Sequence, residues 1–380
     1  MDNNPPFDAR VQFPSHTEPR VWLITAGDSP IGLSVARQVL AHGDYAFLGL
    51  AHSALERDER RRVEFDAFLG EVEQHDGWAQ RMKTVPLDIR MMGECQAVVA
   101  DAVATFGRVD ILLCCTSQAL IGTVEEFSAS IQTMNLVRDQ FEVNYFGPLN
   151  IIKATLPHMR KEQAGHIMII SGITAHIGTP GLGMYCAAGW ALEGFCDSLA
   201  YEIAPFNVKL TIFQCSIEIG ILTNLVTSVP PIFPAYSPVN NQAPLFRGIL
   251  NRLIPQLPDA SISSDSPVTL SRVNDENARV SSVENGPFSA PEVVSMHPPL
   301  SSAHLEVLVA ETVYAITSIG GHENPPSRHI VGQEGVASVK EKLKTVSEEL
   351  EDFIQASFAV DVVAGSDPLP DISGMNDGPY

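Results

Sequence analysis

Residues 21–40 read VWLITAGDSPIGLSVARQVL, and this stretch predicts the fold of the chain. Val21–Thr25 is a short apolar run with β-branched residues, which is typical of a buried strand. After a turn that contains glycine, apolar residues recur at helical spacing, at Ile31, Val35 and Val39. A strand, a tight turn and a helix in this order predict the first half of a βαβ unit.

The same alternation of strand and helix continues along the chain. It predicts an α/β fold: a single domain with a Rossmann-type doubly wound parallel sheet and helices on both faces. The nearly continuous apolar strands fit a sheet that is covered on both faces. The further predicted strands are 45–50, 84–87, 109–115, 166–171 and 208–214, and the further predicted helices are 54–76, 93–106, 134–163 and 304–319.

Composition and charge exclude some classes of function. The chain has 380 residues, 45% of them apolar, which is enough for one large domain with a substantial core. Its net charge of −21 repels phosphate backbones and anionic headgroups, so we expect neither nucleic-acid nor membrane binding. There is no apolar run of the ~18 residues that a spanning helix needs, and the polar N-terminus does not look like a secretion signal. We therefore expect a cytoplasmic protein.

Several segments fall outside the regular pattern. We expect a flexible N-terminus over 1–19, the domain over 20–360 and a flexible tail over 361–380. Residues 255–302 are rich in Ser, Pro, Asn and Asp, and we interpret them as a largely disordered insertion. An apolar stripe over 336–353 indicates a helix, which either packs on the domain or binds a partner.

The cysteines and histidines give no sign of a metal site. None of the six cysteines has the spacing of metal ligands, and we interpret them as small core residues in a reducing compartment. The eleven histidines are scattered along the chain. The sequence therefore predicts no metal site.

Residues 185–203 read YCAAGWALEGFCDSLAYEI. This segment resembles the active-site helix of the short-chain dehydrogenase/reductase family, and it is most similar to members that act on steroids and other lipophilic carbonyls. The resemblance covers roughly residues 20–225 and 303–358, and insertion 255–302 then interrupts the substrate lid. It implies NAD(P)-dependent interconversion of alcohols and carbonyls on a lipophilic or secondary-metabolite substrate. It also implies a homo-oligomer, because family helices of this kind commonly build dimers and tetramers.

The catalytic tyrosine of the family is present, but its lysine is not. The family pattern Tyr-x-x-x-Lys matches Tyr185 and meets Gly189. Since a free tyrosine has a pKa of about 10, proton exchange near neutral pH needs a neighbouring cation worth ~4 kcal/mol. The residue four positions on shares the helix face, and a glycine there supplies no charge. We predict Tyr185 as catalytic, with a structural tyrosine beside a cleft as the alternative.

Two further catalytic positions of the family have a mixed outcome. Asn144 matches the family asparagine that anchors a water relay to the lysine, and a buried polar residue that bends its helix is the alternative. The family serine falls on Gly172, 13 residues before the tyrosine. Ser171 points to the opposite face of a strand, whereas Thr174 reaches the correct side. We therefore predict Thr174 as the substitute hydroxyl.

The turn after the first strand resembles the family motif Thr-Gly-x-x-x-Gly-x-Gly. From this resemblance we predict Thr25, Gly27, Ile31 and Gly32 as cofactor-binding residues. Two glycines of the motif are replaced, by Ala26 and Pro30. The proline lacks the N–H that would bind phosphate. Asp28 also places a negative charge in a loop that binds the phosphate anion in the resembled family. The sequence thus predicts the turn but weak phosphate binding.

The adenosine half of the cofactor site is also only partly matched. Asp88 matches the family residue that contacts adenine, and a helix-capping aspartate is the alternative. Residues 49–52 (GLAH) contain neither an acid for the ribose of NAD nor an arginine for the phosphate of NADP, and His52 favours NADP. The family's Asn-Asn-Ala-Gly is replaced by CCTS over 114–117, and its Pro-Gly by CS over 215–216.

Two functions remain open from the sequence. The first is an NADP-linked oxidoreductase of the resembled family, with impaired or altered catalysis on a lipophilic substrate. The second is a catalytically inactive or non-redox pseudo-dehydrogenase that binds a ligand or a partner. Four features of the family are altered here: the phosphate-binding turn, the Asn-Asn-Ala-Gly motif, the catalytic serine and the catalytic lysine. The sequence therefore leaves the enzyme assignment uncertain.

Overall fold

The computed structural model describes residues 13–51, 55–56, 58–128, 130–216, 219, 226–229, 294–296 and 302–354. The chain divides into two compact units, residues 1–339 and 340–380. The first unit contains the sheet and the candidate site. In the second, the described residues continue helix α12 (Gln333–Asp352), which confirms the helix predicted over the stripe. Whether that stripe packs on the domain stays a prediction.

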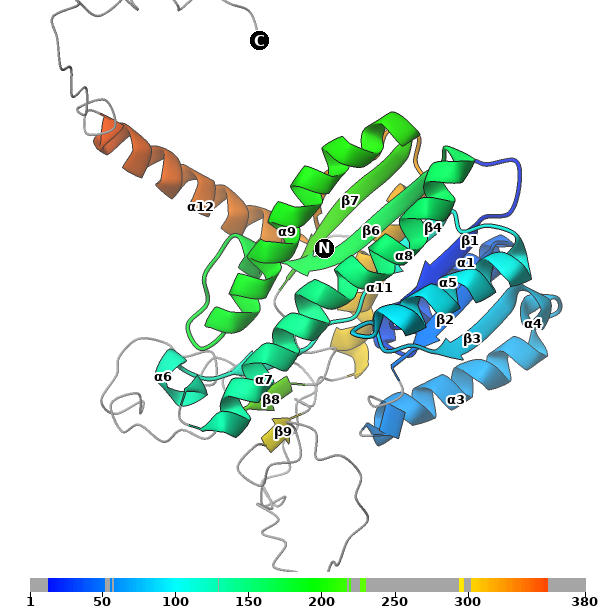
Figure 1. The fold of residues 1–380 in the computed structure, drawn as a ribbon, viewed down its shortest axis with the longest axis horizontal. Helices are drawn as coiled ribbons and strands as arrows, with labels where there is room; N and C mark the ends of the chain where they lie inside the picture. Colours follow the sequence, from blue (N-terminus) through cyan, green and yellow to red (C-terminus); the bar gives the residue numbers. More distant parts are fainter. Residues whose placement is uncertain are drawn as a thin grey trace, which may run out of the picture. The chain divides into compact units, whose positions relative to one another are not determined.

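A parallel sheet forms the centre of the first unit (Figure 1). Within the described residues it has seven strands in the order β10-β7-β6-β4-β1-β2-β3, and every pairing is parallel. Strand order reverses between β1 and β4, which is the arrangement of a doubly wound sheet. The fold prediction is confirmed. The strands are β1 (Val21–Ile24), β2 (Tyr45–Leu50), β3 (Met82–Pro86), β4 (Ile111–Cys114), β6 (Gly165–Gly172), β7 (Val208–Cys215) and β10 (Arg328–Ile330).

Helices cover both faces of the sheet, and each face has its own apolar core. Adjacent strand residues point to opposite faces: Trp22 and Ile24 belong to one cluster and Leu23 to the other. Figure 1 shows α5, α8 and α9 running alongside one another on the second face. The first cluster contains residues of α1 (Pro30–His42), α3 (Glu59–Gln74), α4 (Trp78–Arg81) and α11 (Ser302–Ile319), and the second those of α5 (Met92–Phe106), α8 (Gly147–Glu162) and α9 (Gly183–Ile203).

The helix predicted over 134–163 is interrupted. It consists of α7 (Ile131–Phe141), a π-helical turn η1 (Glu142–Phe146) and α8. Helical periodicity does not reveal a single π-turn, because the apolar stripe continues on both sides of it. The interruption lies at the predicted site residue Asn144.

A small second sheet lies apart from the main one. It joins β5 (Ala119–Ile121), β8 (Val226–Ser228) and β9 (Val294–Met296). Strand β9 pairs antiparallel with β8, and it falls inside the segment interpreted as a disordered insertion. Three residues of 255–302 are therefore in a strand, and most of the remainder lies outside the described residues, as does His52. None of the helices described is long and apolar enough to cross a membrane.

His166 is a buried histidine that joins β6, β7 and the end of α11. Its Nδ1 accepts from Gly321 N at 3.0 Å, so its Nε2 carries the proton and donates to Thr211 Oγ1 at 2.9 Å. Burial is the main reason that the pKa of His166 is lowered to about 3, and the positive charges of Lys209 and Arg20 add to the effect. This histidine is therefore neutral in the folded protein.

This neutral histidine makes the fold sensitive to acid. Below the unfolded-state pKa of about 6.5 the unfolded chain binds a proton that the folded chain does not, so stability falls with pH until about pH 3. We expect a loss of about 3 kcal/mol between pH 6.5 and 4 from this residue. Urea unfolding of the wild type and of His166→Gln at both pH values measures it. An equal pH dependence in the two proteins would contradict the assignment.

Candidate functional site

The candidate site lies where the carboxyl ends of β4 and β6 meet the start of α9. In doubly wound sheets ligands bind at this edge, next to the reversal of strand order. A cavity of about 30 Å³, roughly the space of one or two water molecules, opens here. It is lined by the predicted catalytic residues together with the positions of the missing ones: Ser117, Asn144, Gly172, Thr174, Tyr185 and Gly189.

Tyr185 stands in the first turn of α9 with its side chain almost fully buried. Its hydroxyl lies 3.4 Å from Ser117 Oγ. Burial raises the pKa of Tyr185 to about 12, against a smaller lowering by the Ser117 hydrogen bond. Among the described residues that line the cavity there is no Lys, Arg or His. The phenol is therefore fully protonated at neutral pH.

Packing does not require the glycine at position 189. A Cβ built there would lie 3.5 Å from Ala175 Cβ, which is an ordinary van der Waals contact. The backbone of Gly189 is helical, so a side chain would cause no strain there. Position 189, the lysine position of the resembled family, therefore accepts a Cβ without a clash.

The hydroxyl of Thr174 occupies the place of the missing serine. A Cβ built on Gly172 would lie 2.9 Å from Thr174 Oγ1. Both residues line the cavity beside Tyr185. Ser171 has a different role, because its hydroxyl donates to Glu193 Oε1 at 2.9 Å. The role of Thr174 as the substitute hydroxyl stays a prediction.

Asn144 lies in the π-turn and holds the segment that follows β4. Its Nδ2 donates to Gln118 O at 2.8 Å, and its Oδ1 accepts from Gln118 N at 3.0 Å. Gln118 follows Ser117, the hydroxyl that contacts the tyrosine. Asn144 therefore positions that segment, and π-turns of this kind are often found at functional sites.

The predicted cofactor residues of the β1–α1 turn are held tightly together. Thr25 Oγ1 accepts from Cys115 N at 3.1 Å and from Thr116 Oγ1 at 3.0 Å. A Cβ on Gly32 would lie 2.1 Å from Ala26 O, so only glycine fits there. The buried side chain of Ile31 packs in the first core cluster. The glycine-dependent packing of the family turn is thus preserved.

The N–H groups of this turn are largely used inside the protein. Gly27 N donates to Gly49 O at 2.9 Å, and Ser29 N donates to Ala26 O at 3.0 Å. Gly32 N donates to Ser29 Oγ at 3.0 Å, so the serine caps the helix itself. Pro30 has no N–H to offer. Few donors of the turn remain for a phosphate.

Asp28 places an internal anion in the same turn. Its side chain is fully buried and forms an ion pair with Arg61, Oδ2 to Nε at 2.6 Å. Its Oδ1 accepts from Ala51 N at 3.1 Å, at the end of β2. In Rossmann-type sheets the cofactor ribose is read at this strand end. Donors there that could serve a phosphate already bind a carboxylate.

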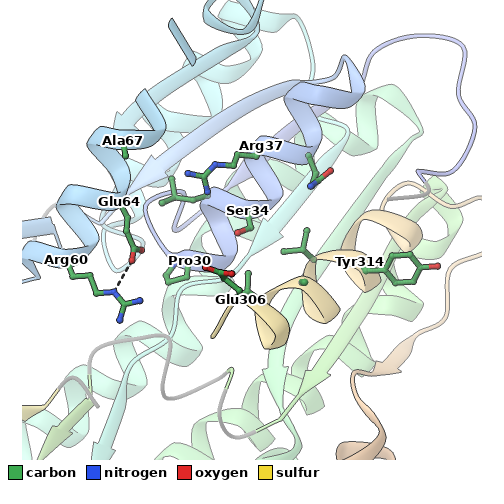
Figure 2. A pocket seen from close by; sticks show the side chains of 13 residues that line it. Pro30, Ser34, Arg37, Arg60, Glu64, Ala67, Glu306 and Tyr314 are labelled. Atoms are coloured by element: carbon green, nitrogen blue, oxygen red, sulfur yellow. Dashed lines mark hydrogen bonds and ion pairs between the residues drawn. The ribbon is translucent and has the colours of Figure 1, made fainter. Parts of the chain in front are cut away.

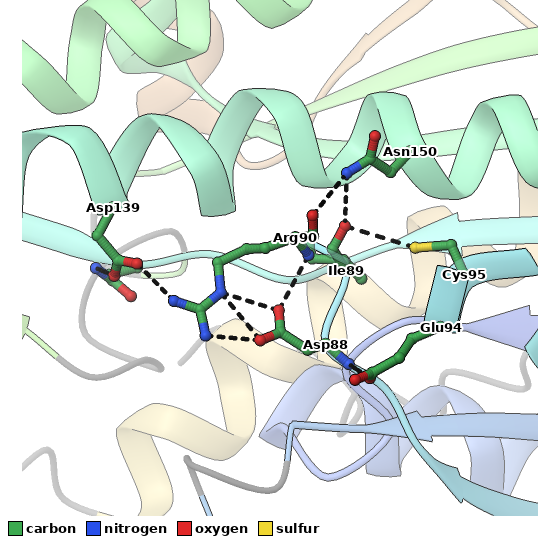
Figure 3. A network of polar contacts seen from close by, with 8 residues as sticks. Asp88, Ile89, Arg90, Glu94, Cys95, Asp139 and Asn150 are labelled. Carbon is green, nitrogen blue, oxygen red and sulfur yellow. Dashed lines mark hydrogen bonds and ion pairs between the residues drawn. The ribbon is translucent and has the colours of Figure 1, made fainter. Parts of the chain in front are cut away.

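Asp88, the predicted adenine contact, belongs to a polar network (Figure 3). Figure 3 shows Arg90 between Asp88 and Asp139, with bonds of 2.6 Å to Asp88 Oδ2 and 2.5 Å to Asp139 Oδ1. Although burial opposes it, the hydrogen bonds from Arg90 hold the pKa of Asp88 below its usual value. Asp139 also accepts from Gln118 Nε2 at 3.2 Å. The network thus connects the end of β3 to the segment held by Asn144.

Taken together, the described residues do not fit the pyrophosphate of a nicotinamide dinucleotide. Such an anion needs open backbone N–H groups and a positive field at the start of the helix. The turn instead has internally bonded N–H groups, a proline and the buried carboxylate of Asp28. The predicted binding roles of Thr25, Gly27, Ile31, Gly32 and Asp88 stay predictions.

A larger hollow lies outside the candidate site. It measures about 440 Å³ and runs between α1, α3 and α11 (Figure 2). Figure 2 shows Glu306 of α11 beside Pro30 and Ser34 of α1. None of the predicted site residues lines this hollow. Its lining begins at Pro30, the residue before Ile31. It has no group in common with the cavity at Tyr185.

Sequence reasoning missed three residues of the site. Ser117 was considered only as part of a replaced motif, although it contacts Tyr185. Arg61 follows Arg60 and precedes Arg62, and nothing in this run of arginines marks the one that is buried. Arg90 follows Asp88 by two positions, and that spacing is the one local signal for their contact.

Comparison with protein families and curated proteins gives one consistent match. Residues 20–228 match the family model of short chain dehydrogenases. Oxidoreductase BOA17 of Botryotinia fuckeliana is 28% identical over 51% of this chain and 64% of its own length. 17-beta-hydroxysteroid dehydrogenase type 1 of Mus musculus is 29% identical over 52% of this chain and 54% of its own length. Retinol dehydrogenase 8 of Homo sapiens is 29% identical over 52% of this chain and 58% of its own length. The chain thus spans between half and two thirds of these relatives.

A solved structure agrees with the fold. A short-chain dehydrogenase from Streptomyces avermitilis superposes with a TM-score of 0.60 and covers 90% of this chain and 100% of its own. Its sequence identity is 22%, so the likeness is one of fold.

Proposed function

We propose that this chain, which belongs to the short-chain dehydrogenase family, is a pseudo-dehydrogenase that binds a small lipophilic ligand or a protein partner and carries out no hydride transfer. The environment of Tyr185 carries this proposal. With a pKa of about 12 the phenol is ionised in only ~1 molecule in 10⁵ at pH 7. The described residues that line the cavity include no cationic side chain to lower this pKa.

The β1–α1 turn supports the same proposal independently. The N–H groups of Gly27, Ser29 and Gly32 are bonded within the protein. Asp28 and Arg61 form a buried ion pair at the ribose end. A dinucleotide would have to break these contacts and accept the negative charge of the aspartate. Binding is therefore expected to be weak or absent.

NADP-linked carbonyl reduction on a lipophilic substrate is the second candidate. It is favoured by the three hydroxyls of Ser117, Thr174 and Tyr185 at one cavity. A protonated phenol remains able to donate a proton to a carbonyl oxygen, although it is a poor base for the reverse reaction. The names of the steroid and retinol dehydrogenase relatives point to the same substrate class.

Cytoplasmic location and self-association are also part of the proposal. All six cysteines, each within the described residues, are buried and unpaired, as is usual in a reducing compartment. A homo-oligomer is proposed from family resemblance alone.

Cofactor calorimetry separates the two candidates. We expect no heat from NADPH or NADH up to about millimolar concentration, because few donors of the turn are open and the buried carboxylate of Asp28 repels a phosphate. A dissociation constant below about 100 μM for either one would overturn the pseudo-dehydrogenase. In that case loss of carbonyl reduction in Tyr185→Phe, with unchanged cofactor binding, would establish the reductase.

A further inference from the structure

Three potential metal ligands meet at the amino edge of the main sheet. His42 is the last residue of α1, Asp44 directly precedes β2, and His16 lies in the segment before β1. His16 Nε2 is 2.9 Å from Asp44 Oδ1, and His42 Nδ1 is 3.4 Å from Asp44 Oδ2. All three ligand atoms lie within 4.8 Å of one another. Because Asp44 precedes its strand, this cluster is at the opposite edge from Tyr185.

The carboxylate at the centre of the cluster is buried. The Asp44 side chain is 1% exposed, and its Oδ1 also accepts from Arg20 N at 2.9 Å. Buried carboxylates are stable when a positive charge compensates them. The guanidinium of Arg20 is near but donates to Gly320 O.

The imidazole of His16 faces the same carboxylate, with its Nε2 2.9 Å from Asp44 Oδ1. Imidazole nitrogen and carboxylate oxygen are both ligands that Zn²⁺ takes in proteins. The cluster thus presents a donor set of the Zn²⁺ type around a buried carboxylate.

We propose that His16, His42 and Asp44 form a binding site for a divalent transition metal of the Zn²⁺ type. Zn²⁺ takes imidazole nitrogen at 2.0–2.1 Å and carboxylate oxygen at 2.0–2.2 Å, so tetrahedral ligand atoms are roughly 3.3 Å apart. The two distances in the cluster lie on either side of that value. Two imidazoles and one carboxylate suit Zn²⁺ better than Mg²⁺ or Ca²⁺.

Neighbouring groups hold the ligands in place and leave an approach from solvent. The ring of Phe13 stacks on His42 with centroids 4.1 Å apart and an interplanar angle of 20°. Groups behind the ligands that fix their orientation are typical of metal sites. The His42 side chain is 33% exposed, which gives an ion access and leaves the fourth position to water.

Metal binding would join the segment before β1 to the turn between α1 and β2. The three ligands come from that segment and from the two ends of the turn, so the ion stabilises the folded state by linkage. The sequence predicted no metal site because His16 is far from the pair His42 and Asp44 in the chain. The parallel pairing of β1 with β2 brings them together.

Calorimetry with ZnCl₂ on the tag-free full-length chain tests the proposal. We expect one equivalent of Zn²⁺ bound with a dissociation constant of micromolar or lower, and a rise in Tm that EDTA reverses. His16→Ala and Asp44→Asn should each weaken binding at least tenfold. His158→Ala, which removes an imidazole of α8, is the matched control and should bind as the wild type does.

Two further readouts separate a metal site from a structural hydrogen-bonded cluster. Co²⁺ should give the intense visible absorption of a tetrahedral complex. His16→Ala removes the bond to the buried Asp44 carboxylate and should lower the Tm in EDTA, so its readout is the loss of the Zn²⁺-dependent rise in Tm. No binding at 100 μM Zn²⁺, or binding that His16→Ala leaves intact, would overturn the proposal. Neither result bears on dinucleotide binding.

Discussion

Replacing Gly189 by lysine is expected to lower the pKa of the Tyr185 phenol by about 1–3 units from its value near 12, because a cation close to an acid stabilises the ionised form. The two positions lie one helical turn apart and line the same cavity. A Cβ at 189 contacts Ala175 at an ordinary distance, so the helix backbone should accept a residue other than glycine there. The phenolate population near pH 8 should rise about 10- to 1000-fold.

Tyrosinate absorbance near 295 nm measures this shift without any cofactor. The titration of Tyr185 is isolated by subtracting that of the same protein with Tyr185→Phe. Gly189→Met is the matched control, since it adds a chain of similar length without charge and should leave the pKa of Tyr185 high. If Gly189→Lys shows no tyrosine that titrates earlier than in Gly189→Met, the missing cation does not explain the state of the phenol.

The fold was predictable from local pattern, and the exceptions have local causes. Every strand predicted for the main sheet is present, because apolar runs buried on both faces are visible in one sequence. The break at η1 was not visible, since a π-turn changes hydrogen bonding but not composition. Strand β9 was missed because three residues within a polar segment carry too little pattern.

The candidate site was predictable at family-motif positions and not elsewhere. Tyr185, Asn144 and Thr174 line one cavity. The first two were predicted by alignment to a motif, and Thr174 was predicted because it lies two positions after Gly172, which aligns with the family serine. The contact of Ser117 with the tyrosine and the pairing of Asp28 with Arg61 depend on side chains from separate elements. No local periodicity encodes such pairs. The sequence therefore predicted which family groups are altered, and the structure added the contacts of Ser117, Asp28 and Arg61.

Replacing Asp28 by asparagine is expected to create affinity for NADPH. The change leaves the shape of the side chain and removes its charge, so the buried guanidinium of Arg61 loses its carboxylate partner. A phosphate is the natural substitute, because a guanidinium pairs strongly with phosphate oxygens. Breaking a buried ion pair costs about 3–5 kcal/mol, and the protein should be correspondingly less stable without ligand.

The contrast between two cofactors makes this prediction specific. NADPH carries a 2′-phosphate near the ribose and NADH does not, so Asp28→Asn should bind NADPH at least tenfold more tightly than NADH. Calorimetry of both cofactors on one preparation measures the ratio, and the Tm gained with NADPH checks it. Asp28→Asn with Arg61→Gln is the matched control, because it removes both charges and should lose the preference. Equal affinity for the two cofactors in Asp28→Asn would mean that Arg61 does not face the ribose, and that its pairing with Asp28 is no obstacle to the cofactor.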